Sequence, residues 1–350
     1  MQVTLDAPSG SQVFDSARGR PILHSALAAG VGVPYECLSG SCGTCKARLR
    51  SGSVERLWTG APAWAMLGRD EVLLCQCSAA EACTLVLKAG HGTRAVLHRP
   101  RDFAGTLSRW RLLGADVVAF SVDLDAPLPF EAGQFVALQL PGVDGTRCYS
   151  MTNAPAGEAR LDLLVRRKTG GTASAWLFER ERNGAAVTGF GAVGSATYDA
   201  TSGHELLCIA GGSGIAGMLS ILECATAHGH FEQRRAELYF GLRRVQDAFL
   251  LAELDALAAR AGPGLRITVA FSDDSVCGEL GAAYPRLGFD SGLVHEVAAR
   301  RCALPIRPQD GLPGVMAYLA GPPAAVNAAL RMLLLQLRLG PGAIRYDKFG

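Results

Sequence analysis

Residues 37–46 read CLSGSCGTCK, so three cysteines fall within nine positions. Cys37, Cys42 and Cys45 follow the spacing C-x4-C-x2-C, and Cys75 comes after 29 further residues, in VLLCQCSA. The chain has 11 cysteines, an odd number, and its first ten residues, MQVTLDAPSG, show no basic segment followed by an apolar one, so we expect no secretion signal. Because the cytosol keeps thiols reduced, a disulfide framework is not expected and the cysteines are candidate metal ligands.

The spacing of these cysteines distinguishes two kinds of metal site. Zinc sites normally pair two short C-x2-4-C hooks, and only one hook of this kind is found here. C-x4-C-x2-C with a distant fourth cysteine is instead the ligand pattern of plant-type [2Fe–2S] clusters, which need two thiolates per iron and backbone N–H groups directed at the sulfurs. Gly40 and Gly43 would let the backbone approach such a cluster closely and adopt unusual dihedral angles. Cys77 is the alternative fourth ligand. The predicted metal ligands are Cys37, Cys42, Cys45 and Cys75.

The residues around the cysteines predict a small domain of strands and one helix. MQVTLDA and SQVFDSA alternate like the two strands of a hairpin, and PILHSALAAGV has helical periodicity. CKARLRSGSVE resumes a strand pattern and turns at Ser51 and Gly52. Residues 1–92 therefore resemble plant-type ferredoxins, and the resemblance implies a β-grasp fold.

The middle of the chain changes pattern after a basic linker at 93–102. Residues 103–200 contain short alternating runs with turn signals between them, which predict an antiparallel, six-stranded barrel. RCYSMTNAP, residues 147–155, resembles the flavin motif R-x-Y-S-x-x-N of the ferredoxin–NADP reductase superfamily, and VRRKTGGTASAWL resembles its second flavin motif. Taken from the residues alone, Tyr149 could equally be a core aromatic and Arg147 a surface charge.

The resemblance implies FAD rather than FMN, and it implies a role for each motif residue. Arg147 would bind the pyrophosphate, Tyr149 would pack on the isoalloxazine, and the Ser150 hydroxyl would reach N5, the hydride-accepting atom. Gly171, Thr172 and Ser174 would bind phosphate at a helix start. The predicted flavin-binding residues are Arg147, Tyr149, Ser150, Asn153, Leu164, Val165, Arg166, Gly171, Thr172, Ser174 and Phe349, of which Ser150 and Phe349 are predicted to be catalytic.

The last part of the chain, residues 201–350, alternates strand-like and helix-like segments and predicts a doubly wound parallel sheet. GGSGIAG places glycines between a strand and a helix, a natural site for a pyrophosphate. It resembles the superfamily's nicotinamide motif G-G-x-G-x-x-P, with Gly217 in place of proline and Ala320 in place of a frequent cysteine. The predicted nucleotide-binding residues are Gly211, Gly212, Gly214, Arg243, Gly321 and Pro322.

Two further features concern the nucleotide and the end of the chain. Asp273 and Asp274 would repel a 2′-phosphate, so we expect NADH rather than NADPH, although Arg243 and Arg244 lie in the preceding strand region. The final AIRYDKFG resembles the family's terminal YDKF segment, which implies that Phe349 stacks beside the flavin and swings aside for nicotinamide. An ordinary frayed end is the alternative.

Together the motifs resemble the reductase component of multicomponent bacterial oxygenases, of the benzoate or naphthalene dioxygenase or the soluble methane or toluene monooxygenase type. The resemblance implies an oxidoreductase that takes hydride from NADH onto FAD and passes single electrons through the cluster. Its partner would be a terminal oxygenase or hydroxylase component, or a separate ferredoxin. The alternatives are a reductase serving a desaturase, demethylase or cytochrome P450, and a non-enzymatic redox sensor.

Composition limits the partners further. The net charge of +2 and the pI of about 8.0 are too mild to indicate nucleic acid or a membrane surface, and glycine, proline and charged residues interrupt the most apolar stretches. Residues 1–94 carry nine Lys and Arg against seven Asp and Glu, so the domain charge is nine minus seven, or +2. Because this charge is not acidic, we expect the cluster loop to face outward and to dock its partner through apolar contacts at Leu38 and Ser39. We also expect the protein to be a cytoplasmic monomer.

Overall fold

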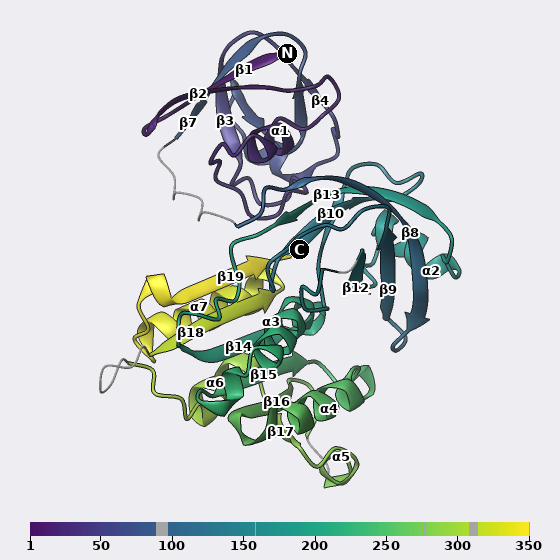
Figure 1. Ribbon diagram of the computed structural model, residues 1–350, viewed down its shortest axis with the longest axis vertical. Helices are drawn as coiled ribbons and strands as arrows, with labels where there is room; N and C mark the ends of the chain where they lie inside the picture. The colour runs from purple at the N-terminus through teal and green to yellow at the C-terminus, as the bar shows by residue number, and fades with distance from the viewer. Residues whose placement is uncertain (89–96, 158, 276–277, 308–313, 350) are drawn as a thin grey trace.

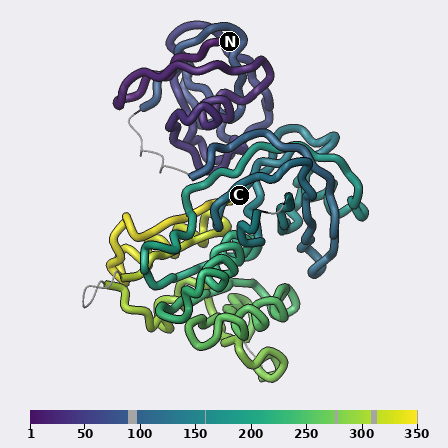
Figure 2. The backbone as a smooth tube through the Cα atoms, viewed as in Figure 1, coloured from purple at the N-terminus to yellow at the C-terminus, as the bar shows by residue number. Residues whose placement is uncertain are grey.

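The computed structural model describes residues 1–88, 97–157, 159–275, 278–307 and 314–349, and these form three domains (Figure 1). The N-terminal domain packs against one side of a strand-rich middle domain, and the C-terminal domain lies beyond it. Figure 2 shows that the chain ends close to the middle of the molecule, where the three domains approach one another.

The N-terminal domain is a five-stranded mixed sheet with the order β2-β1-β7-β3-β5. β1 pairs in parallel with β7 and antiparallel with β2, while β3 pairs antiparallel with β7 and β5. The predicted hairpin and helix are both present, and helix α1 buries six of its seven residues. The elements are β1 (Gln2–Ala7), β2 (Gly10–Asp15), α1 (Ile22–Ala28), β3 (Lys46–Ser51), β4 (Val54–Arg56), η1 (Pro62–Met66), β5 (Glu71–Leu73), β6 (Cys77–Ala79) and β7 (Cys83–Leu87).

The middle domain is a six-stranded antiparallel sheet with the order β11-β10-β13-β8-β9-β12. An antiparallel bridge between Met151 and Leu163 joins its two outer strands, so the sheet curls into a nearly closed barrel. The last two residues of the predicted linker, 101 and 102, belong to β8 and pair with β13. Residues 93–96 of the linker lie outside the described residues. The elements are β8 (Arg101–Leu112), β9 (Val117–Leu124), β10 (Phe135–Gln139), β11 (Arg147–Ser150), β12 (Arg160–Arg166), α2 (Thr172–Glu179) and β13 (Ala186–Val193).

The C-terminal domain is a parallel six-stranded sheet with the order β17-β16-β15-β14-β18-β19. Successive residues of β14 alternate between two apolar cores: Cys208 packs with helices α3 and α4, and Leu207 packs with α6 and α7 on the other face. The elements are β14 (Glu205–Gly211), α3 (Ile215–Ala227), β15 (Ala236–Leu242), α4 (Leu251–Ala261), β16 (Leu265–Phe271), α5 (Gly278–Ala283), β17 (Leu287–Ser291), α6 (Val294–Arg301), β18 (Val315–Gly321), α7 (Pro323–Leu335) and β19 (Ile344–Lys348).

The strand order places the start of the domain at its centre. β14 comes first in the chain and lies between β15 and β18, so the winding reverses at this point. In doubly wound sheets, ligands bind beyond the carboxyl ends of the strands at such a reversal. Here that position is the edge formed by Gly211 at the end of β14 and Gly321 at the end of β18.

The sequence did not predict two strands or the late start of one helix. β17 and β19 are short strands at the two sheet edges, and β19 carries the C-terminal segment alongside β18. Helix α4 begins only at Leu251, because Val245–Asp247 before it form a 3-10 turn and Leu250 has a left-handed backbone with φ 62°.

Apolar contacts join the N-terminal domain to the barrel. Phe135, Ala137, Phe190 and Val193 of the barrel pack into the same apolar cluster as the core of the N-terminal domain, and Phe349 packs against that cluster. In the part of the chain that the structure describes, no helix combines the length and apolar character needed to cross a membrane.

Candidate functional site

The cysteine loop has the backbone geometry that its glycines predict. Gly40 and Gly43 both have φ +75°, a left-handed conformation that strains other residues. A Cβ atom on Gly40 would lie 2.7 Å from Cγ of Gln76 and 2.8 Å from Cβ of Ala61. The loop is therefore closely packed from outside and bends sharply at both glycines.

The four predicted ligand thiols, three in the loop and one at Cys75, lie in two pairs. Cys37 hydrogen bonds through its side chain with Cys42, and this contact, helped by Ser41 and Ser39, lowers the pKa of Cys37 to about 4. Cys75 makes the same kind of contact with Cys45, which together with burial raises the pKa of the Cys75 thiol.

Backbone N–H groups also point at the sulfurs. The amide of Cys42 donates to Sγ of Cys37, and the amide of Thr44 donates to Sγ of Cys42, each with a nitrogen–sulfur distance of 3.4 Å. Donors of this kind stabilise thiolates and the extra negative charge of a reduced cluster.

The two pairs of thiols fit the ligand set of a two-iron cluster. Within the described ranges, no three His, Cys, Asp or Glu side chains converge on one point that would hold a single ion. Two thiol pairs, one within the loop and one between Cys45 and Cys75, are what a binuclear cluster requires, since each iron takes two cysteines. Cys77, the alternative ligand, is completely buried at the start of β6, and burial is the largest cause that raises the pKa of its thiol.

Beside the loop lies a cavity of about 460 Å³ whose wall includes residues from all three domains. The N-terminal domain contributes Cys37, Ser39 and Ser41. The barrel contributes Arg147, Cys148, Tyr149, Ser150, Leu164, Val165, Arg166, Arg167, Lys168, Gly171, Ala173 and Ser174. The C-terminal domain contributes Ser213, Ala216, Pro322 and Phe349.

Nine of the eleven predicted flavin residues therefore line this cavity, and two do not. The side chain of Asn153 fastens the turn between β11 and β12, because its Nδ2 donates to the Arg160 carbonyl and its Oδ1 accepts from the Asp162 amide. Thr172 is the first residue of α2 and is exposed. Asn153 and Thr172 do not line the cavity, so their assignment as cofactor-binding residues stays a prediction.

The cavity is basic where a pyrophosphate would bind. Its wall includes Arg147, Arg166, Arg167 and Lys168, and cations of this type suit the oxygens of a phosphate. Arg166 is held by Asp116, with 2.6 Å between Nε and Oδ2. The guanidinium groups and the adjoining apolar wall fit a flavin nucleotide, which combines a flat apolar ring with a diphosphate.

Arg147 makes a contact that the sequence did not reveal. Its guanidinium carbon lies 4.6 Å from the ring centre of Trp58 in the N-terminal domain, and its NH1 donates to the carbonyls of Asp144 and Thr146. The residue predicted to bind the flavin pyrophosphate therefore also touches the cluster domain.

The glycine motif of the C-terminal domain shapes the turn rather than the cavity wall. A Cβ atom on Gly214 would lie 2.4 Å from the Ala320 carbonyl oxygen, and one on Gly321 would lie 3.0 Å from that of Gly211. Gly211, Gly212, Gly214 and Gly321 do not line the flavin cavity, whereas Pro322 does. The glycines thus allow the ends of β14 and β18 to come together at the predicted nucleotide site.

Gly217, which stands in place of the proline of the nicotinamide motif, lies close to Ser150. A Cβ atom there would lie 3.7 Å from Cβ of Ser150, an ordinary contact distance, so α3 begins directly against the predicted hydride-site serine. Ser150 itself is 8% exposed and lines the cavity.

Arg243 directly follows β15, the strand that lies next to β14 in the sheet. Its guanidinium pairs with Asp273 at 3.2 Å, and Ser272 and Arg243 hold the pKa of this carboxyl below its ordinary value. Asp273 is therefore negatively charged at neutral pH, as the prediction for NADH requires.

Comparisons with known proteins agree with this three-part arrangement. Residues 6–80 match the 2Fe-2S iron-sulfur cluster binding domain, residues 104–198 the oxidoreductase FAD-binding domain, and residues 208–330 the oxidoreductase NAD-binding domain. The ferredoxin–NAD(+) reductase component of the alkene monooxygenase system of Xanthobacter autotrophicus is 33% identical over 340 residues, covering 96% of this chain and 97% of that protein. The chain belongs to this family of iron–sulfur flavoprotein reductases.

Two solved structures of such reductases resemble the whole chain. The ferredoxin reductase in carbazole 1,9a-dioxygenase has a TM-score of 0.80 at 28% identity and covers 100% of this chain and 99% of its own. The Amycolatopsis cytochrome P450 reductase GcoB has a TM-score of 0.79 at 28% identity, with coverage of 99% and 98%. The family match confirms the predicted fold class and the predicted cofactors: a [2Fe–2S] cluster, FAD and a nicotinamide nucleotide.

One expectation about this reductase chain is wrong. Leu38 is 1% exposed and packs in the core of the N-terminal domain, and Ser39 faces the flavin cavity. These residues therefore do not form an outward docking surface. Spacing alone predicted ligands in the loop but not the direction in which the loop faces, because that direction depends on contacts between domains.

Proposed function

We propose that this chain is the NADH-dependent reductase component of a multicomponent oxygenase and delivers single electrons to a terminal oxygenase or to a separate ferredoxin. Bound flavin would accept one hydride, which carries two electrons, and the cluster would carry electrons one at a time. The named relatives, a reductase of an alkene monooxygenase system and one in carbazole 1,9a-dioxygenase, support this proposal.

The observation that carries the proposal is the shared cavity. Ser39 from the cluster loop, Tyr149 from the barrel and Pro322 from the nucleotide domain all line one space of about 460 Å³. The cluster loop and the nucleotide domain therefore border the same cavity, in which electrons would pass from one to the other. Such proximity is what a chain of three cofactors needs.

Individual roles follow from position. Tyr149 and Phe349 provide apolar faces for the flavin ring, and Ser150 offers a hydroxyl inside the cavity. Arg147 and Lys168 offer charge for the pyrophosphate. We propose the thiolates of Cys37, Cys42, Cys45 and Cys75 as the cluster ligands.

The nucleotide preference and the working form are also part of the proposal. A charged Asp273 beside Arg243 would repel a 2′-phosphate and favours NADH. All three binding regions come from one chain, so we propose a monomer as the working unit. The cytoplasm is the compartment we propose for it, because reduced thiols are maintained there.

The test is a spectroscopic and kinetic study of the purified protein. We expect iron, sulfide and FAD in the ratio 2:2:1 required by one [2Fe–2S] cluster and one FAD per chain, roughly within assay error. We also expect NADH to bleach the flavin and to drive cytochrome c reduction, with a higher kcat/KM for NADH than for NADPH. Absence of iron and sulfide, or no reduction by either nucleotide, would overturn the proposal, and a preference for NADPH would overturn only the nucleotide assignment.

A second acceptor deserves a direct comparison, because GcoB is a cytochrome P450 reductase that resembles the chain over its whole length. Reconstitution with a Rieske oxygenase, a di-iron hydroxylase and a P450 would separate the two candidates. Efficient turnover with the P450 alone would favour the second function.

A further inference from the structure

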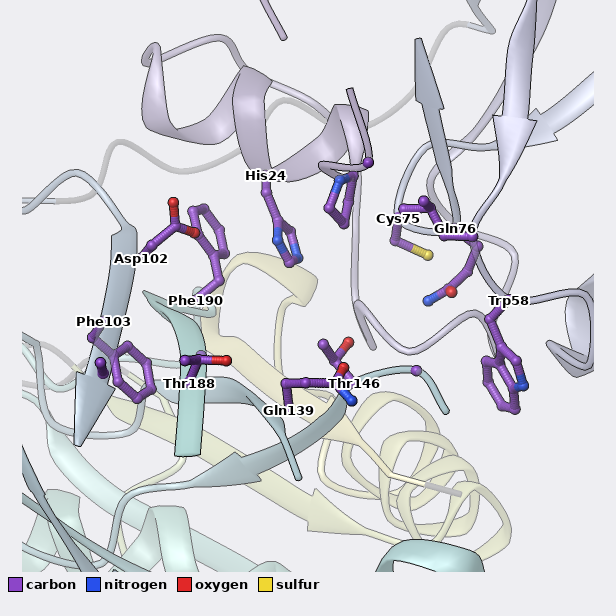
Figure 3. A pocket seen from close by; sticks show the side chains of 16 residues that line it. His24, Trp58, Cys75, Gln76, Asp102, Phe103, Gln139, Thr146, Thr188 and Phe190 are labelled. Carbon is purple, nitrogen blue, oxygen red and sulfur yellow. The ribbon is translucent and has the colours of Figure 1, made fainter. Parts of the chain in front are cut away.

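A second and larger cavity lies between the cluster domain and the barrel, apart from the flavin cavity. It has a volume of about 610 Å³, and no residue that lines it also lines the flavin cavity. One wall comes from the N-terminal domain, including His24, Trp58 and Cys75, and the other from the barrel, including Phe103 and Phe190 (Figure 3). Small-molecule sites usually have volumes of about 300–1,000 Å³, so this space is of the right size for a ligand.

His24 is the unusual residue in this cavity. It projects from α1 toward the barrel (Figure 3), is 4% exposed, and stacks on Phe190 with 4.0 Å between ring centres and 7° between planes. Its Nε2 is buried and, within the described part of the chain, has no hydrogen-bond partner. A buried polar atom without a partner costs about 1–3 kcal/mol, so a ligand that satisfies it has an evident source of binding energy.

The acidic side chain in the cavity lining is paired with a basic one. Asp102 is the acidic side chain of the lining, and it forms an ion pair with Arg20, whose guanidinium lies 5.5 Å from the ring centre of Phe190. Burial, followed by the charge of Arg20, lowers the pKa of His24 to about 3, so the imidazole is neutral at physiological pH. A charged ligand would find no opposite charge that is free of an ion pair in this lining.

The remaining lining is aromatic or weakly polar. Trp58, Phe103 and Phe190 present ring surfaces, while Gln139 and Thr188 add polar groups from the barrel strands. Flat apolar ligands stack on aromatic rings, and a ligand hydroxyl both donates and accepts, so it suits either tautomer of a neutral imidazole.

We propose that this interdomain cavity binds a neutral aromatic molecule that carries a hydroxyl group, with the ring among the aromatic side chains and the hydroxyl on Nε2 of His24. The site touches Cys75, a proposed cluster ligand, and joins the cluster domain to the barrel. A bound molecule would therefore change the surroundings of the cluster without entering the flavin cavity. The proposal does not depend on which protein accepts the electrons.

Calorimetric titration of the FAD-loaded protein with 2-naphthol tests the site, and naphthalene is the matched probe without the hydroxyl. His24→Phe keeps the stacking on Phe190 but removes Nε2. Because a neutral hydrogen bond contributes about 0.5–1.5 kcal/mol, we expect this change to weaken 2-naphthol binding roughly two- to twelvefold and to leave naphthalene binding unchanged. Binding of 2-naphthol should also shift the EPR signal of the reduced cluster.

A second variant covers the case in which His24→Phe fails to fold. Ala104 is an exposed residue of the lining, so Ala104→Trp fills the cavity from the surface without disturbing a core. We expect it to abolish binding of both probes while iron and FAD contents stay normal. No binding of 2-naphthol to the unaltered protein, or binding that neither substitution changes, would overturn the proposal. Binding only to protein reconstituted with FMN would also overturn it, since the adenylate of FAD would then occupy the cavity.

Discussion

Two segments far apart in the sequence both line the flavin cavity, and they are held there in different ways. The cluster loop, residues 37–45, is anchored from inside its own domain: Cys37, Leu38 and Cys45 are at most 4% exposed. The C-terminal segment, residues 344–349, is half-buried along its length and pairs with β18 on one side only. Its last described residue, Phe349, is held by a hydrogen bond of 3.1 Å from its backbone N–H to the Gly321 carbonyl and by an edge contact with Phe135.

This difference indicates how each wall should respond to change. A loop with buried cysteines and a closely packed Gly40 has little room to shift, so damage there should be severe. A strand at a sheet edge with one aromatic contact can shift, so damage there should be graded. The predictions below test this contrast, from the largest expected effect to the smallest.

The most severe change should be Cys75→Ser. Loss of a direct ligand should cost more than the roughly 10–100-fold that loss of an outer-shell partner costs in metal affinity, so we expect the isolated protein to lack its cluster. NADH-driven cytochrome c reduction should fall to background, while reduction of ferricyanide by the flavin continues. Iron analysis and EPR measure the first effect, and stopped-flow absorbance the second.

Cys77→Ser is the matched control, because Cys77 is equally buried and lies only two residues away. We expect it to keep its iron and to lose only modest stability from a buried hydroxyl. If Cys77→Ser lost the cluster and Cys75→Ser kept it, the assignment of the fourth ligand would be reversed.

A single methyl group at Gly40 should come next. Gly40→Ala places a Cβ atom within 2.8 Å of both Gln76 and Ala61, in addition to the strain of a positive φ. Gly142 has φ +70° with nothing within 4 Å, so Gly142→Ala reports the backbone strain alone. Overpacking typically costs about 1–3 kcal/mol, and we expect Gly40→Ala to be less stable than Gly142→Ala by this amount.

Thermal or denaturant unfolding of both variants, with iron release followed in parallel, measures this difference. Equal loss of stability would mean that the loop yields to the new methyl group. The cluster loop would then be as adaptable as the C-terminal segment, and the contrast between the two walls would disappear.

The two walls also differ in how far sequence predicted them. A ligand set could be proposed from sequence because three of the four cysteines lie within nine positions, and the chemistry of the metal fixes their spacing. The barrel and the parallel sheet could be predicted for a similar reason, since alternation along each strand and the glycines at Gly211 and Gly212 are local signals.

What sequence missed depends on pairing between distant segments. β19 has no strong strand pattern, and its position is set by its register beside β18, where Arg345 pairs with Tyr318. The cavity around His24 forms only where two domains meet, so a lone histidine on a helix gave no signal of it. Leu38 was misplaced for the same reason: an apolar residue beside a metal ligand can face a partner or its own core, and only the folded domain decides.

The smallest of these effects should follow from Phe349→Ala. The ring lies 5.8 Å from Phe135, nearly perpendicular to it at 87°, and forms part of the cavity wall. Aromatic pairs contribute about 0.5–1.5 kcal/mol, so we expect flavin to dissociate about two- to tenfold more readily, and Phe349→Tyr to restore the affinity.

Iron content should stay normal, because the cluster loop does not depend on this ring. Equilibrium dialysis followed by flavin fluorescence measures the affinity. Iron loss in Phe349→Ala would show that the two walls are coupled, whereas unchanged flavin affinity would show that the ring does not touch the cofactor and that the C-terminal segment only borders the cavity.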